Sequence, residues 1–294
     1  MGLLVASRHV PVLSAEVLTW LTPQPGETWV DATTGGGGHT KLLAERVGNT
    51  GRVIALDRDE SMLVAAKQRL AGLPVTFVQA SFDQIDSVLA DQGLKSVDGV
   101  LADLGVCSDQ LDDPARGLSF QQPGPLDMRL DSSHGETAAH LLARLNERDL
   151  ADVIYRYGEE RFSRRIARKI VEARQTSPLR TTQELAELVR RCVPRERGRH
   201  LDPATRTFQA LRIAVNDELA VLEIFLQKLP ACLRTGGRAG LISFHSLEDR
   251  LVKRAFQNKD VWDVRTRKPV TASDEECARN PRARSAKLRV AVRR

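Results

Sequence analysis

Short apolar runs and helical patterns alternate along the first hundred residues, and this alternation constrains the fold more than any other feature of the sequence. We expect four buried strands, at Thr28–Ala32, Arg52–Leu56, Val75–Gln79 and Val97–Ala102. The helical segments between them are Thr40–Val47, Glu60–Leu70 and Gln84–Asp91. Strands separated by helices of this length are joined by right-handed crossovers, which makes them parallel neighbours in one sheet. The sequence therefore predicts an α/β domain with a mostly parallel, Rossmann-like sheet.

A helical stretch interrupts this pattern in the middle of the chain. After a loop-like segment over residues 112–125, helical periodicity runs through Thr137–Leu145, Glu147–Arg156, Glu160–Arg174 and Thr182–Cys192. A long helix over Phe208–Leu229 then leads to a strand at Ala239–Phe244 and a helix at Leu247–Phe256, as if the sheet resumed. We predict a discontinuous domain formed by residues 1–112 and 205–294, with residues 113–204 as an inserted all-helical domain.

The charge of the chain is divided unevenly between its halves. Residues 1–150 carry 12 Lys and Arg against 20 Asp and Glu, whereas residues 151–294 carry 32 against 18. A basic half is typical of a protein that meets a polyanion such as nucleic acid, although solvated helix faces would give the same excess. The candidate RNA contacts are the arginine face of Arg161, Arg164, Arg165 and Arg168, the run Arg190–Arg199 and the tail Arg279–Arg294.

Other features of the sequence narrow the class of protein. No apolar run approaches the roughly 18 residues that a membrane span needs. The first residues lack the basic leader of a signal peptide, so we expect a cytoplasmic protein with no membrane partner. The cysteines are Cys107, Cys192, Cys232 and Cys277, and they match no zinc-binding spacing, which predicts no metal site. Without a secretory signal, we expect their thiols to be reduced.

Carboxylates follow three of the predicted strands, and a glycine-rich turn lies beside the first of them. These carboxylates are Asp31, Asp57 and Asp103, and the segment TTGGGGH over residues 33–39 follows Asp31. In an open parallel sheet, ligands bind beyond the carboxyl ends of the strands, and a carboxylate placed like Asp57 can accept hydrogen bonds from ribose hydroxyls. Glycines allow the backbone to approach such a ligand closely. The sequence therefore predicts a site for a nucleoside cofactor.

Two cofactors suit this layout, a nicotinamide dinucleotide and S-adenosyl-L-methionine. The dinucleotide calls for the pattern G-x-G-x-x-G, whose third glycine is missing because Thr40 stands at its position. S-adenosyl-L-methionine carries a sulfonium and an ammonium group, which suit the acidic strand ends at Asp31 and Asp103. The residues favour the methyl donor and leave a nicotinamide-dependent oxidoreductase as the alternative.

Sequence blocks spread over nearly the whole chain resemble one family. They are DATTGGGGHT (31–40), ALDRD (55–59), ADLGVCSDQLDD (102–113), RGLSF and GPLDMRLD (116–131), YGEERFSRRIARKI (157–170), DPATRTFQALRIAVNDEL (202–219), ISFHSLEDRLVKR (242–254) and NPRARSAKLRVA (280–291). In this order they are similar to the bacterial small-subunit ribosomal RNA methyltransferase H family, the MraW-type proteins. The resemblance implies a class I S-adenosylmethionine-dependent methyltransferase fold with an inserted helical domain. It also implies methyl transfer to the 4-amino nitrogen of one cytidine in the decoding region of 16S ribosomal RNA.

The resemblance further implies the residues of the cofactor site. Gly37, Gly38 and His39 would contact the cofactor, Asp57 would bind its ribose and Phe82 would border the adenine, while Asp103 and Gln110 would complete the pocket. The substrate would be 16S ribosomal RNA within the small ribosomal subunit, with the inserted domain recognising the RNA. Members of the family are capable of forming a homodimer, on which the residues themselves say nothing.

The sequence departs from the family's pattern at four positions, which are Cys107, Asp109, Pro123 and Asp202. The departure at Asp202 replaces a potential cation with an anion beside the expected RNA face. Cys107 is expected to line the pocket as a small side chain, because transfer to an amino group needs no covalent nucleophile.

Two residues are candidates for the proton acceptor of the reaction. The exocyclic nitrogen of cytosine is a poor nucleophile, because its lone pair is delocalised into the ring, and an acceptor bonded to one N–H can take the departing proton. Asp103 is the best-placed acceptor, with cofactor binding as its alternative role. His245, at the end of the late strand, is the second candidate, with a structural role as its alternative. For the whole chain, a non-catalytic RNA-binding factor of ribosome assembly on the same scaffold is the alternative function.

Overall fold

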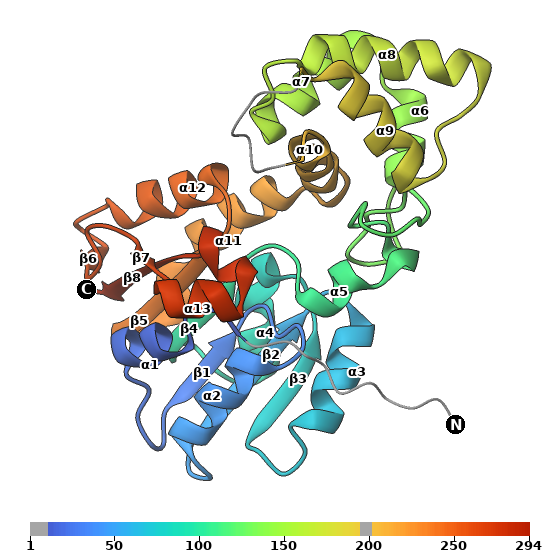
Figure 1. Cartoon of the computed structure of the whole chain (residues 1–294). Helices are drawn as coiled ribbons and strands as arrows, with labels where there is room; N and C mark the ends of the chain where they lie inside the picture. Colours follow the sequence, from blue (N-terminus) through green and yellow to red (C-terminus); the bar gives the residue numbers. More distant parts are fainter. Residues whose placement is uncertain (1–10, 195–201) are drawn as a thin grey trace. The chain divides into compact units, whose positions relative to one another are not determined.

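The computed structural model describes residues 11–194 and 202–294, and the chain forms two compact units. The first combines Met1–Cys107 with Leu219–Arg294 and is called the sheet unit below; the second, Ser108–Glu218, is called the helical unit. Figure 1 colours both by position in the sequence. In the part of the chain that is described, no helix has both the length and the apolar character needed to cross a membrane.

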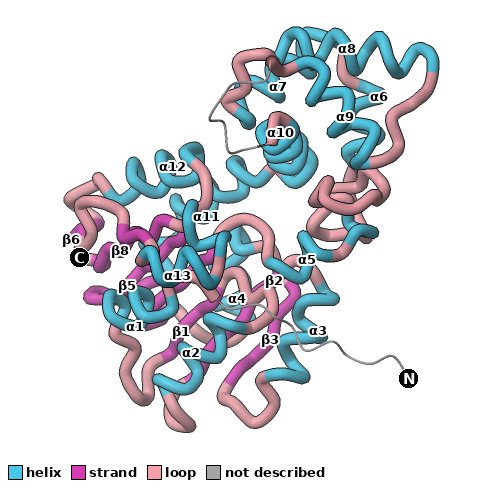
Figure 2. Tube along the Cα trace, in the orientation of Figure 1, coloured by secondary structure: helices cyan, strands magenta, loops and turns pink. Residues whose placement is uncertain are grey.

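One mixed sheet organises the sheet unit (Figure 2). Its strands are β1 (Thr28–Asp31), β2 (Arg52–Asp57), β3 (Val75–Gln79), β4 (Val97–Asp103), β5 (Leu233–Ser243), β6 (Trp262–Val264), β7 (Val270–Thr271) and β8 (Lys287–Arg293). Their order is β3-β2-β1-β4-β5-β8-β6, with β7 paired to β8. The first five strands are parallel, whereas β8 runs antiparallel to its neighbours. The direction of the order reverses between β1 and β4, and α/β sheets bind their ligands at such a point.

Helices cover both faces of this sheet. They are α1 (Ser14–Leu21), α2 (Gly38–Val47), α3 (Glu60–Arg69), α4 (Ile85–Asp91), α11 (Glu218–Cys232), α12 (Ser246–Phe256) and α13 (Asp274–Arg279), with the 3-10 helices η1 (Phe82–Gln84) and η3 (Pro281–Ser285). Successive residues of a strand point to opposite faces, so Val30 of β1 joins the core with α4, α11 and α12, while Trp29 joins the core with α1 and α2. This architecture confirms the predicted α/β fold, a Rossmann-like, mostly parallel sheet with a helical insertion.

The C-terminal residues form a strand of the sheet, whereas the sequence predicted a basic tail. Instead of a basic tail that contacts RNA, residues 287–293 form β8, which lies between β5 and β6. Arg289 is buried, and its Nε donates a hydrogen bond to Asp249 Oδ1 at 2.6 Å. Arg293 likewise donates to the carbonyl of Pro230. For this strand the prediction of an RNA surface is wrong, because Leu288 and Val290 bury the strand in the sheet.

The helical unit is built from α-helices, three of which begin at a side-chain cap. They are α5 (Ser108–Asp112), α6 (Ala138–Arg144), α7 (Glu147–Gly158), α8 (Ser163–Thr176), α9 (Thr182–Cys192) and α10 (Ala204–Asn216), with the 3-10 helix η2 (Pro114–Arg116). The side chains of Thr137, Asn146 and Thr181 each accept a backbone N–H of the first turn, which explains why α6, α7 and α9 begin where they do.

The predicted long helix over Phe208–Leu229 is two helices in the structure. The backbone turns at Asp217, whose φ of 50° lies in the left-handed region, so α10 ends at Asn216 and α11 begins at Glu218. α10 packs on α7 so closely that a Cβ at Gly158 would lie 2.5 Å from the carbonyl oxygen of Arg206. The helical unit therefore includes α10, whereas the sequence placed the boundary at 204/205; at the other end the boundary lies at 107/108 instead of 112/113.

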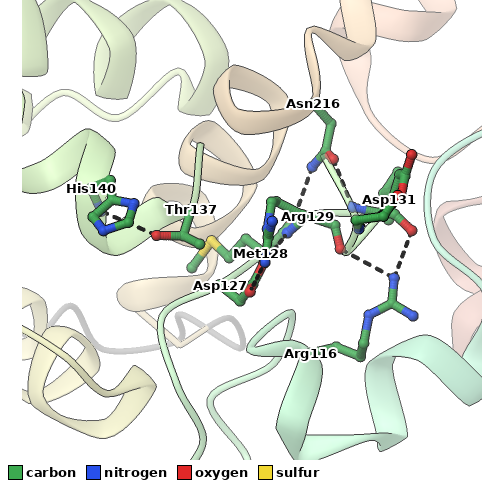
Figure 3. A network of polar contacts seen from close by, with 10 residues as sticks. Arg116, Asp127, Met128, Arg129, Asp131, Thr137, His140 and Asn216 are labelled. Carbon is green, nitrogen blue, oxygen red and sulfur yellow. Dashed lines mark hydrogen bonds and ion pairs between the residues drawn. The ribbon is translucent and has the colours of Figure 1, made fainter. Parts of the chain in front are cut away.

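A network of polar contacts fixes the loop before α6 within the helical unit (Figure 3). Arg116 donates hydrogen bonds to the carbonyls of Arg129 and Leu130, at 3.1 and 2.7 Å. The Asn216 side chain accepts the N–H of Leu130 and donates to the carbonyl of Met128, both at 2.8 Å. These contacts connect the segment GPLDMRLD to the last turn of α10 and stabilise Met128 at its φ of 64°.

Candidate active site

The carboxyl ends of four neighbouring strands bring the predicted site residues to one edge of the sheet. Asp57 ends β2, Asp31 ends β1 and Asp103 ends β4. The next strand, β5, ends at Ser243, two residues before His245. Asp103 is in register with Ile242 of β5, so Asp103 and His245 come from adjacent strand ends. The structure thus places three acidic side chains and one histidine along the edge where the strand order reverses.

The glycine-rich turn after β1 owes its shape to backbone conformation and to close packing. Gly35 and Gly37 have φ values of 47° and 82°, which side chains disfavour. A Cβ on Gly37 would lie 3.1 Å from Leu70, and one on Gly38 would lie 3.0 Å from Pro11. Arg69 of α3 also donates a hydrogen bond to the carbonyl of Gly36. The glycines therefore serve the packing of the turn itself.

Asp57 is surrounded by backbone amides. Its Oδ2 accepts the N–H of Gly35 at 2.7 Å, and its Oδ1 accepts the N–H of Asp59 at 2.9 Å. Burial raises the pKa of Asp57 to about 6, although these two hydrogen bonds oppose the shift. A carboxylate has about four lone-pair sites, so two amide bonds leave acceptor capacity on both oxygens. Asp57 can therefore accept further hydrogen bonds from a ligand.

Asp31 differs from Asp57 in its role, because its carboxylate oxygens accept hydrogen bonds from the residues of the glycine-rich turn. The residue is fully buried, with Oδ2 accepting the hydroxyl of Thr40 at 2.7 Å and Oδ1 accepting the N–H of Thr33 at 3.2 Å. Burial raises the pKa of Asp31 above its ordinary value, and the Thr40 bond opposes this shift. Asp31 thus stabilises the glycine turn from within. Thr33 and Thr40 were not predicted as site residues, although both belong to the block DATTGGGGHT.

His39 and Asp103 form a pair beneath the glycine turn. His39 is 4% exposed, and its Nδ1 lies 3.5 Å from Asp103 Oδ2. Its other nitrogen, Nε2, lies 2.9 Å from the carbonyl oxygen of Val12. Burial alone would lower the pKa of His39, but the contact with Asp103 and the charge of Asp31 outweigh it, so the pKa is raised.

One oxygen of Asp103 is left without a hydrogen bond. The backbone N–H of Asp103 donates to Thr33 Oγ1 at 2.6 Å, and Oδ2 faces His39. Oδ1 is shielded from solvent and has no hydrogen-bond partner within residues 11–194 and 202–294. A buried carboxylate oxygen without a donor is costly to maintain, so this atom indicates where a ligand donates a hydrogen bond.

His245 caps α12. Its Nδ1 accepts the N–H of Glu248 at 3.4 Å, while its Nε2 lies 3.3 Å from Glu248 Oε1. Glu248 in turn accepts the N–H of Phe244 at 2.9 Å, which completes a capping box at the start of the helix. Helix capping therefore accounts for Nδ1 of His245, whereas Nε2 is buried and forms no hydrogen bond with the other described residues.

The remaining predicted site residues lie in different surroundings. Phe82 begins η1 and packs edge-on against Phe225, with ring centroids 5.2 Å apart. Cys107 Sγ lies 3.4 Å from Met62 Sδ, and its Cβ lies against Gly35. Gln110 belongs to α5 of the helical unit, where it is 5% exposed. The structure therefore places Cys107 beside the glycine turn, in line with its predicted position.

The helical unit carries exposed cations on α8 and α9. Arg164, Arg165 and Arg191 are exposed and form no ion pair with the other described residues. Burial raises the pKa of the Cys192 thiol, and the charges of Arg165, Lys169 and Arg191 oppose this shift, so these three cations gather around one point. We call the exposed cations Arg164, Arg165 and Arg191 the basic cluster, whereas Lys169 pairs with Glu172 at 2.6 Å.

Two other arginines predicted to contact RNA, Arg168 and Arg190, form ion pairs within the helical unit. Arg168 lies 3.5 Å from Glu147, and Arg190 pairs with Asp202 at 2.9 Å. Asp202 also accepts the N–H of Ala204 at 2.8 Å, which gives this departure from the family pattern a role at the start of α10. Residues 195–199 of the predicted basic run lie outside the described residues.

The chain is similar to known proteins over nearly its whole length. The profile of the MraW methylase family matches residues 6–294 of the chain. The protein named Ribosomal RNA small subunit methyltransferase H from Sorangium cellulosum (strain So ce56) is 55% identical over 288 residues, which are 97% of this chain and 91% of that protein. The protein of the same name from Deinococcus deserti is 52% identical and covers 97% of this chain and 93% of its own length. Among solved structures, an rRNA methylase from Streptococcus thermophilus covers 95% of this chain and 93% of its own, with a TM-score of 0.42 and 12% identity.

Proposed function

Because the chain belongs to the MraW methylase family, we propose that it transfers a methyl group from S-adenosyl-L-methionine to the 4-amino nitrogen of one cytidine in the decoding region of 16S ribosomal RNA. The family and the methyltransferase class expected from the sequence are confirmed by matches over nearly the whole chain. S-adenosyl-L-methionine is the methyl donor of this class. The names of the relatives, which refer to small-subunit ribosomal RNA, support the choice of substrate.

The observation that carries the proposal is the buried Oδ1 of Asp103, an unpaired acceptor at the point where the strand order reverses. An amino group held there donates one N–H to this oxygen, which keeps its nitrogen lone pair available and directs it toward the methyl carbon. As the nitrogen takes up the methyl group that the bound donor would supply, the amine proton would pass to Asp103. We assign the acceptor role to Asp103 rather than His245, because Nδ1 of His245 accepts the backbone N–H of Glu248, so the hydrogen of the neutral ring lies on Nε2 and neither nitrogen is a free acceptor.

Other residues of the sheet unit would hold the cofactor. The acceptor capacity left on Asp57 suits the two ribose hydroxyls, and the turn at Gly37, Gly38 and His39 lies beside it. Phe82 offers a half-buried ring for the adenine. When bound, the cofactor supplies an activated methyl group with a neutral thioether as leaving group.

The pH dependence of cofactor affinity tests the role of Asp57. Because its pKa is raised to about 6, the ionised acceptor is fully present above pH 7 and is lost as the pH falls through 6. We expect the affinity for S-adenosyl-L-methionine, measured by titration calorimetry from pH 5 to 8, to decline below pH 6 and at most tenfold per pH unit. Asp57→Asn should bind roughly 10–100-fold more weakly at pH 7.5, because a hydrogen bond to a charged acceptor is lost. A decline below pH 6 that persists in Asp57→Asn would assign the titration to another group.

The basic cluster of the helical unit would bind the phosphates of the RNA. Each phosphate that a cation neutralises releases condensed counterions, which makes the affinity dependent on salt. We expect the triple variant Arg164→Gln, Arg165→Gln, Arg191→Gln to reduce the slope of log K against log salt by about 2, taking about 0.7 per charge for single-stranded RNA. The matched control is Arg168→Gln, whose side chain faces Glu147. Equal slopes for the triple variant and the wild type would mean that the basic cluster is an ordinary solvated surface and does not bind RNA.

The proposed function has a direct test. Purified protein, S-adenosyl-L-methionine and small ribosomal subunits from cells that lack the activity are incubated, and the ribosomal RNA nucleosides are analysed by mass spectrometry. We expect 4-methylated cytidine at one position. Binding of the donor without any methylated product would point to another acceptor, and binding of the RNA without the donor would favour the non-catalytic assembly factor.

A further inference from the structure

His39 has an environment in which each ring nitrogen faces an acceptor. Nε2 lies 2.9 Å from the carbonyl oxygen of Val12, which can only accept, so Nε2 carries a hydrogen. Nδ1 lies 3.5 Å from Oδ2 of Asp103. A neutral ring with its hydrogen on Nε2 would direct the Nδ1 lone pair at this carboxylate oxygen, which is a repulsive arrangement. A second hydrogen on Nδ1 turns the same contact into an attraction.

The charges around His39 favour the same protonation state. Asp103 reaches the ring from β4 and Asp31 acts on it from β1, and both are acidic. The third partner, Val12, comes from the segment before α1 and contributes the negative end of a carbonyl dipole. The ring is buried, so solvent does not weaken these interactions.

From this geometry we propose that His39 is a positioning residue: as an imidazolium it holds Oδ2 of Asp103 and thereby presents Oδ1 to the amino group that is methylated. The assignment of Oδ1 to an amine rests on the proposed function, whereas the charged His39–Asp103 pair does not. The imidazolium also balances the charge of a carboxylate that is removed from water. His39 touches neither reacting atom in this scheme and acts through Asp103.

The pair has a consequence for the pH dependence of the rate. As the pH rises through the pKa of His39, the ring loses its Nδ1 hydrogen and Oδ2 loses its donor. Asp103 can then rotate, and we expect the rate constant of methyl transfer to fall. The alkaline limb of the pH–rate profile should have the same midpoint as the titration of His39.

The first measurement determines the protonation state of His39 directly. Full-length protein with isotope-labelled histidine is titrated by NMR, and His39 is identified among the six histidines with His39→Gln. We expect both ring nitrogens of His39 to carry hydrogens at pH 7. In Asp103→Asn the titration midpoint should move down by about one pH unit or more. A neutral His39 at pH 7 in the wild-type protein would overturn the proposal.

The second measurement separates positioning from a merely structural role. In single-turnover assays, His39→Gln should lower the rate constant of methyl transfer by about tenfold or more and should remove the alkaline limb. His140→Gln, an exposed histidine of α6, is the matched control and should keep the wild-type profile. A His39→Gln protein that is slower but retains the alkaline limb would contradict the proposal. If the wild-type protein forms no 4-methylated cytidine, the proposed function fails, and the NMR titration still decides whether the charged pair exists.

Discussion

Asparagine in place of Asp103 is expected to lower kcat for methyl transfer by a factor of about 10²–10⁴, the usual contribution of a positioned proton acceptor. Asparagine keeps the size of the side chain but cannot accept a proton from the amine. Its amide can also turn its nitrogen toward the position of Oδ1, where it would repel the amine N–H. The rate is measured in single-turnover assays with saturating cofactor and RNA, so that binding defects do not contribute.

The matched control for this variant lies on the same strand. Asp98, near the opposite end of β4, accepts the N–H of Thr28 at 2.7 Å and pairs with Arg234. Asp98→Asn is expected to leave kcat unchanged, since these contacts lie at the far edge of the sheet from Asp103. An Asp103→Asn protein that is folded and works within threefold of the wild-type rate would rule out Asp103 as the acceptor.

Alanine at Gly99 is expected to destabilise the fold by about 3 kcal/mol or more, at or beyond the upper end of typical overpacking costs. A Cβ at this position of β4 would lie 2.3–2.5 Å from ring carbons of Trp29 on the adjacent strand. Trp29 is fully buried, and its indole N–H donates to Glu27 at 2.9 Å. Arg238 lies over the same ring at 5.0 Å. The indole therefore has no space into which it can move.

Urea denaturation measures this effect, and Gly240→Ala on the next strand is its control. The nearest atoms to a Cβ at Gly240 are the terminal carbons of Leu21, at 2.8 and 2.9 Å, which can rotate away. We expect a cost of about 1 kcal/mol there, at the lower end of the same range. Equal destabilisation by the two variants would mean that the rigidity of Trp29 does not determine the cost.

Strands and helices with strong hydrophobic periodicity could be predicted from the sequence. The remaining elements could not, because contacts between residues distant in the chain determine them. The first four strands agree with their predicted ranges within one residue, because each is a short, largely apolar run between turn signals. The break at Asp217 was missed because the apolar pattern continues across it without glycine or proline. β8 was taken for a basic tail because its arginines suggested solvent, whereas Arg289 is buried through its pairing with Asp249.

The candidate site was predictable in its outline but not in its details. Acidic residues directly after apolar runs placed Asp57 and Asp103 at strand ends, since the end of a strand follows from local sequence. The contacts of His39 with Val12 and Asp103 join residues 27 and 64 positions away, and no local pattern signals them. Helix capping by His245 follows from the spacing of His245 and Glu248, three residues apart, which fits a capping box.

The discontinuity of the sheet unit has a consequence for biosynthesis. A ribosome releases β1 to β4 first and then all of the helical unit before it makes β5, so the growing chain carries a half-sheet whose edge at β4 has no neighbour yet. Exposed strand edges promote aggregation, and domains generally fold as units during synthesis. The half-sheet must therefore stay protected while more than a hundred residues are added. The sheet is complete only when β8 inserts between β5 and β6.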